Sequence, residues 1–178
     1  TLSDPRVEQP SLRRYYLVPS STTAAAGEGP ALDVLAQLMG GGSNSYLYRA
    51  LVIDRQLAVN AGAGYQGTSL DPSQFSISVS PKPGVEFSQI EQAIDGVIAD
   101  MIQNPARAED LERVKTQLIA EAIYAQDSQA TLARWYGGAL TTGLSIDDIR
   151  SWPDRIRAVT AEQVRAVAQK WLEKKRSV

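Results

Sequence analysis

The sequence predicts an α+β fold in which helices cover one face of an antiparallel sheet. One strand-like segment comes first, two helical segments and a hairpin follow, and the remainder of the chain is helical. Because helices and strands do not alternate one by one, this order does not favour a parallel sheet with helices on both faces. With 178 residues, of which 43% are hydrophobic, the chain is long enough for one domain with its own core.

A linker is expected to precede this domain. Residues 1–11 contain two prolines and show no apolar period, which indicates a connection from an upstream domain that the sequence does not include. The single domain then spans residues 12–178. Its first strand is expected over residues 12–18 (LRRYYLV), which are rich in aromatic and β-branched side chains and stop before Pro19.

Two helices should follow this strand. The first begins at Pro30 and ends at the glycine triplet 40–42, with Leu35 on its apolar stripe. The second begins directly after the triplet, turns Leu51 inward and ends near Gln56. Both helices are therefore expected to pack their apolar sides against the sheet.

The next two strands are expected to form an antiparallel hairpin. Residues 58–66 alternate small side chains, residues 74–80 (QFSISVS) alternate apolar with polar ones, and a turn over residues 67–73 joins them. This period of two predicts that one face of the hairpin is buried.

The rest of the chain is predicted to be helical. Ser88 and Glu91 have the spacing of a capping box, and the helix that they open is broken at residues 104–105. A second long helix comes next, and a third begins near Asp127.

Two shorter helices are expected to complete the chain. One covers residues 145–150 and is stopped by Trp152 and Pro153, and the last is opened by a capping box at Thr160. The helix residues that should be buried against the sheet are Leu35, Leu51, Ile94, Val97, Leu118 and Leu132.

The composition excludes several classes of site. The chain has neither His nor Cys, so it lacks the side chains that dominate zinc sites, the commonest general base and the thiolate nucleophile. We therefore expect no catalytic residue, no metal ligand and no bound cofactor in this chain. A formal net charge of −2 without clusters of Lys or Arg predicts no nucleic-acid partner, and the short apolar stretches predict no membrane span.

Three local patterns have ordinary structural interpretations. The glycine triplet 40–42 lacks the Lys-Ser/Thr pair of a P-loop and joins two helices, which disfavours a phosphate site. The acidic run 109–112 suits a helix N-terminus. Trp135, Trp152 and Trp171 are expected in the core rather than around a cofactor, and a Ser-Lys dyad stays open as a nucleophile.

Several motifs resemble one family of peptidases. The run 40–51 (GGGSNSYLYRAL), followed by 56–58 (QLA), is similar to the segment G-G-x-x-S-R-L-x-x-x-L-R-x-x-x-G-L-A-Y of pitrilysin/insulinase-type zinc peptidases. Residues 81–84 (PKPG) and 149–153 (IRSWP) are further matches, and the matches extend over nearly the whole chain. The likeness is to the C-terminal, non-metal-binding domain of two-domain bacterial members, which implies a fold like that of the mitochondrial processing peptidase.

The resemblance implies a function for a larger protein. In that family an H-x-x-E-H helix of the first domain binds the zinc, and the second domain forms the opposite wall of a peptide chamber. It therefore implies the non-catalytic half of a zinc metalloendopeptidase, which works with an N-terminal catalytic domain or a separate zinc-binding subunit on peptide substrates. Bacterial relatives imply the periplasm. A degenerate scaffold or partner-subunit domain without a peptidase role is the alternative, and pairing into a homodimer stays open.

The same alignment assigns candidate residues of the chamber wall. The Arg of the family's L-R falls on Val52, the Tyr of G-L-A-Y falls on Val59, and the Arg after Ser45 is replaced by Tyr46. Two valines cannot donate hydrogen bonds to a peptide carbonyl, so this wall would offer shape and apolar contact. Tyr46 or the neighbouring Tyr65 is expected to replace part of the lost donors.

Overall fold

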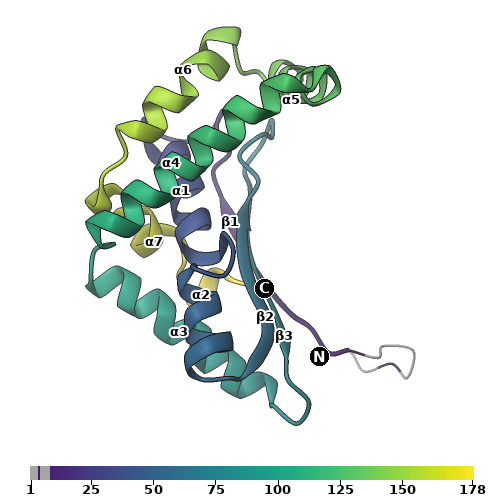
Figure 1. Ribbon diagram of the computed structural model, residues 1–178, viewed down its shortest axis with the longest axis vertical. Coiled ribbons are helices and arrows are strands. Elements are labelled where there is room, and N and C mark those ends of the chain that lie inside the picture. The colour runs from purple at the N-terminus through teal and green to yellow at the C-terminus, as the bar shows by residue number, and fades with distance from the viewer. Residues whose placement is uncertain (1–3, 5–8) are drawn as a thin grey trace.

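The computed structural model describes Asp4 and residues 9–178, and its centre is a three-stranded sheet (Figure 1). The strands are β1 (Leu12–Val18), β2 (Ala58–Tyr65) and β3 (Ser73–Pro81). They lie in the order β1-β3-β2, and β3 pairs antiparallel with both neighbours. The linker expected over residues 1–11 falls mostly outside the described residues, so the linker and the domain bounds stay predictions.

The helices lie together on one side of this sheet (Figure 1). In chain order they are α1 (Glu28–Gly40), α2 (Tyr46–Tyr48), the π-helical turn η1 (Arg49–Asp54), α3 (Phe87–Gln103), α4 (Ala108–Tyr124), the 3-10 turn η2 (Ala125–Asp127), α5 (Gln129–Thr141), α6 (Ile146–Arg157), α7 (Ala161–Trp171) and the 3-10 turn η3 (Lys174–Arg176). The predicted α+β class, with an antiparallel sheet covered by helices on one face, is confirmed.

Strand β3 shows why only one face of the sheet is buried. Phe75, Ile77 and Val79 are at most 2% exposed, whereas Ser78 between them is exposed. Successive side chains of a strand point to opposite faces, so the apolar set packs under the helices and the polar set does not. The hairpin predicted from this alternation is confirmed, since β2 and β3 pair along their length.

The helix residues expected in the core divide into two groups. Four of the six are buried: Leu35, Leu51, Ile94 and Val97. Leu118 and Leu132 are only half-buried, so the prediction was wrong for these two. Leu132 belongs to α5, whose main contacts are with η2 and α6 and which buries only Ala139.

The start of α3 also differs from the prediction. The capping box is formed by Glu86 and Gln89, and the Glu86 N–H donates to Gln89 Oε1 at 3.1 Å. Ser88 therefore lies inside the first helical turn and does not cap the helix with Glu91. The two pairs have the same spacing, and the structure uses the earlier one because the chain is already helical from Phe87.

The helix expected to stop before Pro153 continues to Arg157 as α6. Ser145 and Asp148 form a capping box at its start, and Ile156 beyond the proline is completely buried. Pro153 lacks an N–H and removes one helical hydrogen bond. The cap and the buried isoleucine stabilise the helix on both sides of that missing bond.

Candidate functional site

One face of the sheet carries no helix from the described part of the chain (Figure 1). On β3 this open face presents Ser76, Ser78 and Ser80, and on β2 Gly64 and Gly62 pair with the first two serines. A Cβ atom added at Gly64 would meet only the Ser76 hydroxyl, at 3.7 Å. Small side chains therefore leave a smooth polar surface over two adjacent strands.

Strand β1 extends this open face with larger side chains. Arg13, Tyr15 and Leu17 alternate with the buried residues of β1 and pair with Ser78, Ser76 and Gln74 of β3. Leu17 is 69% exposed. The open face thus combines a polar strip of small residues with an aromatic and an aliphatic contact beside it.

The two valines of the predicted chamber wall lie in neighbouring elements. Val52 is half-buried on η1, where the Arg55 N–H donates to the Ala50 carbonyl oxygen at 3.1 Å, five residues back along the chain. Val59 is 46% exposed beside an irregularity in β2, where the register shifts between Ala58 and Asn60. Residues 43–56 were expected to form one regular helix, and this π-helical turn replaces its second half.

The two tyrosines expected to supply lost donors are already hydrogen-bonded elsewhere. Tyr46 donates to Asp110 Oδ2 at 3.3 Å, at the start of α4, and burial together with this carboxylate raises the pKa of the phenol. Tyr65 donates to the Pro19 carbonyl oxygen at 2.7 Å. Val59 and Tyr65 stand near opposite ends of β2, about 20 Å apart at the usual rise of a strand. The structure therefore does not gather the four candidate residues into one cluster.

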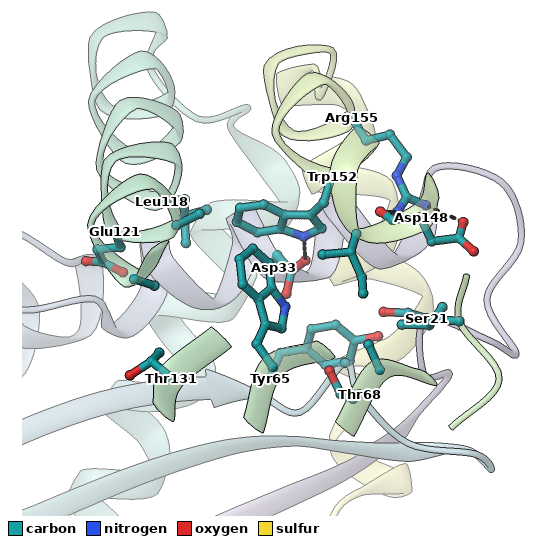
Figure 2. A pocket seen from close by; sticks show the side chains of 17 residues that line it. Ser21, Asp33, Tyr65, Thr68, Leu118, Glu121, Thr131, Asp148, Trp152 and Arg155 are labelled. Carbon is teal, nitrogen blue, oxygen red and sulfur yellow. Dashed lines mark hydrogen bonds and ion pairs between the residues drawn. The ribbon is translucent and has the colours of Figure 1, made fainter. Parts of the chain in front are cut away.

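The helix side of the sheet contains a cavity that the sequence patterns did not predict. It has a volume of about 370 Å³ and lies between α1, α4, α5, α6 and the end of β2. Its lining includes Asp33, Tyr65, Trp135 and Trp152, and Figure 2 labels three of these, Asp33, Tyr65 and Trp152. The core placement expected for the tryptophans is wrong for Trp135, which is half-buried at this cavity, whereas Trp152 and Trp171 pack against the core.

Asp33 is a charged group in direct contact with the aromatic lining of this cavity. Trp152 Nε1 donates to Asp33 Oδ2 at 3.0 Å, which links α1 to α6. Burial raises the pKa of Asp33 to about 6, and the Trp152 hydrogen bond and the Arg155 charge act in the opposite direction. The signal that could have revealed the site is Asp33 itself, a carboxylate inside the apolar stripe of residues 30–39 (PALDVLAQLM).

The described residues offer no metal site. Within that part of the chain, no group of three or more His, Cys, Asp or Glu side chains is placed to hold a metal ion. The zinc implied for the larger protein therefore does not fit the side chains described here, and no step of chemistry is assigned to it in this chain. No helix among these residues is long and apolar enough to cross a membrane.

A comparison with protein families and a comparison with solved structures both find peptidases similar to this chain. The model of the peptidase M16 inactive domain matches residues 2–118. A protease from Helicobacter pylori shares the fold with a TM-score of 0.88 and 19% identity, and a proposed zinc protease from Bordetella pertussis Tohama I shares it with a TM-score of 0.82 and 19% identity. Both likenesses cover 98% of this chain, and they cover 41% and 93% of the respective relatives. This chain thus spans about two fifths of the Helicobacter pylori protease.

A more distant likeness is to a protein described as periplasmic. The periplasmic protease PqqL from Escherichia coli matches with a TM-score of 0.63 and 14% identity, over 91% of this chain and 18% of PqqL. No curated protein sequence matches the chain. At these identities the structural comparisons show the fold, and the family match rests on residues 2–118.

Proposed function

This chain belongs to the peptidase M16 inactive-domain family, and from that premise we propose that it is the non-catalytic half of a zinc metalloendopeptidase. In this proposal an N-terminal catalytic domain or a separate subunit holds the zinc, and this chain closes the peptide chamber opposite it. The length of the Helicobacter pylori relative, of which this chain spans 41%, supports such a larger partner. The periplasmic relative supports a periplasmic location.

The open face of the sheet is the surface that we assign to the chamber wall, and it is the observation that carries the proposal. A bound peptide needs room along its backbone, and Gly62, Gly64 and the serines of β3 project little from the sheet. Serine hydroxyls can donate to and accept from a peptide backbone. Leu17 and Tyr15 add apolar contact at one side. The surface therefore suits binding of extended peptides by shape and hydrogen bonds without strong sequence preference.

The wall supplies binding rather than chemistry in this proposal. Val52 and Val59 stand where the family pattern has an Arg and a Tyr, and neither can donate a hydrogen bond to a developing oxyanion. The hydroxyls of Tyr46 and Tyr65 are engaged with Asp110 and Pro19. Transition-state donors are therefore expected from the zinc-binding half, and this half aligns the peptide.

A bulky substitution on the open face tests the proposal in the native protein that contains this chain. Ser78→Trp places a large side chain at the middle of the central strand, and Ala99→Trp places the same side chain on the exposed side of α3. Peptide hydrolysis should be sensitive to a chelator. Its kcat/KM should fall at least about tenfold for Ser78→Trp, a loss of ~1.4 kcal/mol in transition-state binding, and stay near the native value for Ala99→Trp.

Two results would overturn the proposal. A native protein that contains no zinc and hydrolyses no peptide would favour the scaffold alternative. Equal activity of Ser78→Trp and Ala99→Trp, with both variants folded by circular dichroism, would show that the open face does not line the chamber.

A further inference from the structure

The cavity on the helix side of the sheet is separate from the open face and has a distinct chemical character. Its volume of about 370 Å³ falls in the range of small-molecule sites. Two indoles and a phenol line it, from Trp135, Trp152 and Tyr65, and Leu118 adds aliphatic surface. The faces of aromatic rings carry partial negative charge and attract cations. The lining therefore favours a ligand with an apolar stem and a positive charge.

A carboxylate is placed at this aromatic lining. Figure 2 shows Asp33 between Trp152 and Tyr65, with its hydrogen bond to the Trp152 indole. The negative charge of Asp33 contributes to the raised pKa of Tyr65, after burial, which agrees with their proximity. Among the described residues no Lys or Arg lies within ion-pair distance of Asp33, and the Arg155 charge acts on it only from farther away. A buried carboxylate without a paired cation gains most from a cationic ligand.

The other charged groups of the lining leave an excess of negative charge. Arg155 is the one cation in the described lining, and it is engaged with Asp148, at 3.7 Å between Nη1 and Oδ1 and 2.5 Å between Nη2 and the backbone oxygen. Glu121 adds a further carboxylate from α4. Three carboxylates thus share the lining with one guanidinium, which favours positively charged ligands over anions.

Trp171 shows that cationic side chains of the same molecule take positions over another indole ring. Lys170 Nζ lies 4.8 Å from the centre of the Trp171 ring and the Arg176 guanidinium lies 5.4 Å from it. Within the described residues no side-chain cation takes a comparable position over Trp152. The Trp152 ring at the cavity is therefore not engaged by a cation of the described residues.

We propose that this cavity binds an alkylammonium or alkylguanidinium group, with the charge at Asp33 and the alkyl stem against Trp152 and Trp135. A lysine or arginine side chain of a peptide and a free small cation share this chemistry. The proposal does not depend on the chamber role of the open face, because the cavity and that face lie on opposite sides of the sheet.

A pair of isosteric probes tests the charge requirement. Butylguanidinium is cationic, and butylurea has nearly the same shape without the charge. The three indole N–H signals of the chain can be followed by nuclear magnetic resonance, with Trp152→Phe identifying the Trp152 signal. Butylguanidinium should shift the Trp152 signal saturably, with a Kd of about 1 mM or tighter, and should leave the Trp171 signal unchanged. Butylurea should bind at least about tenfold more weakly.

Two further experiments complete the test: one uses a variant of Asp33, and the other uses a pair of peptides. Asp33→Asn keeps an acceptor for the Trp152 indole but removes the charge, and it should weaken butylguanidinium at least about tenfold. A capped tripeptide with a central arginine, compared with its citrulline counterpart, identifies the source. Binding of the arginine peptide at similar affinity indicates a peptide side chain, and binding of butylguanidinium alone indicates a free small cation.

Three results would overturn the proposal. The first is that neither butylguanidinium nor the arginine tripeptide binds saturably. The second is that butylurea and butylguanidinium bind equally well. The third is that a folded Asp33→Asn variant binds butylguanidinium with unchanged affinity. The last two would describe an apolar cavity without selectivity for charge.

Discussion

The two faces of strand β3 share one backbone and differ in what they do for the molecule. On one face Phe75, Ile77 and Val79 are buried under the helices, and on the other Ser76 and Ser78 lie outside the helical layer. Burial of the apolar set stabilises the fold, because it removes apolar surface from water. The serines carry little of that stability. A single alternating strand therefore separates the requirements of folding from those of the peptide contact that we propose for the open face.

The largest expected effect comes from truncating the buried face. Ile77→Ala should lower the free energy of unfolding by about 3 kcal/mol, because it leaves a cavity at a fully buried site in the central strand. Ser78→Ala, one residue further on the open face, should change it by less than about 0.5 kcal/mol. Denaturant unfolding of both variants measures the difference. Similar losses for the two would show that the open face is part of the stabilising core.

The helix-covered side also contains the carboxylate of Asp33, and its titration should sharpen the comparison. The pKa of Asp33 is raised to about 6, so the folded state binds a proton that the unfolded state releases near pH 4. In this window the unfolded state holds fewer protons than the folded state, and the contribution of Asp33 to stability falls as pH rises from about 4 to 6.

Asp33→Asn should remove this contribution. Relative to the native chain, the variant should be equally stable near pH 4 and more stable at pH 8 by about 1 to 3 kcal/mol, since its amide oxygen can still accept from Trp152. Thermal unfolding between pH 4 and pH 8 measures the difference. A variant that loses stability at pH 8 would show that the charged form of Asp33 stabilises the fold.

Much of the fold was predictable from local patterns. The alternation around Ile77 predicted the hairpin and its buried face, and the apolar spacing around Leu35 predicted α1. The capping box at Thr160 also predicted the start of α7, where the Gln163 N–H donates to Thr160 Oγ1 at 3.2 Å. These signals are local, because period and caps depend on residues within one or two turns.

The features of the fold that were not predicted depend on tertiary packing, which the spacing of residues along the sequence does not encode. The sequence places Leu132 on an apolar stripe, but α5 has few partners on that side and the residue stays half-buried. Pro153 breaks isolated helices, yet the buried Ile156 keeps α6 continuous. The cavity at Asp33 joins residues of α1 and α6, which are distant in the chain, so no local pattern could place them together. The assignments of Val52 and Val59 to the chamber wall stay predictions.

The central claim is that the open face of the sheet, rather than the helical side, meets the peptide. Photo-crosslinking in the native protein tests it most directly, with benzoylphenylalanine in place of Ser78 on β3 or in place of Ala99 on α3. A labelled peptide is added in the presence of a chelator, which should prevent the proposed zinc-dependent cleavage and leave binding intact. The proposed chamber wall predicts efficient labelling from position 78 and background labelling from position 99. Equal labelling from both positions, or labelling from position 99 alone, would contradict it.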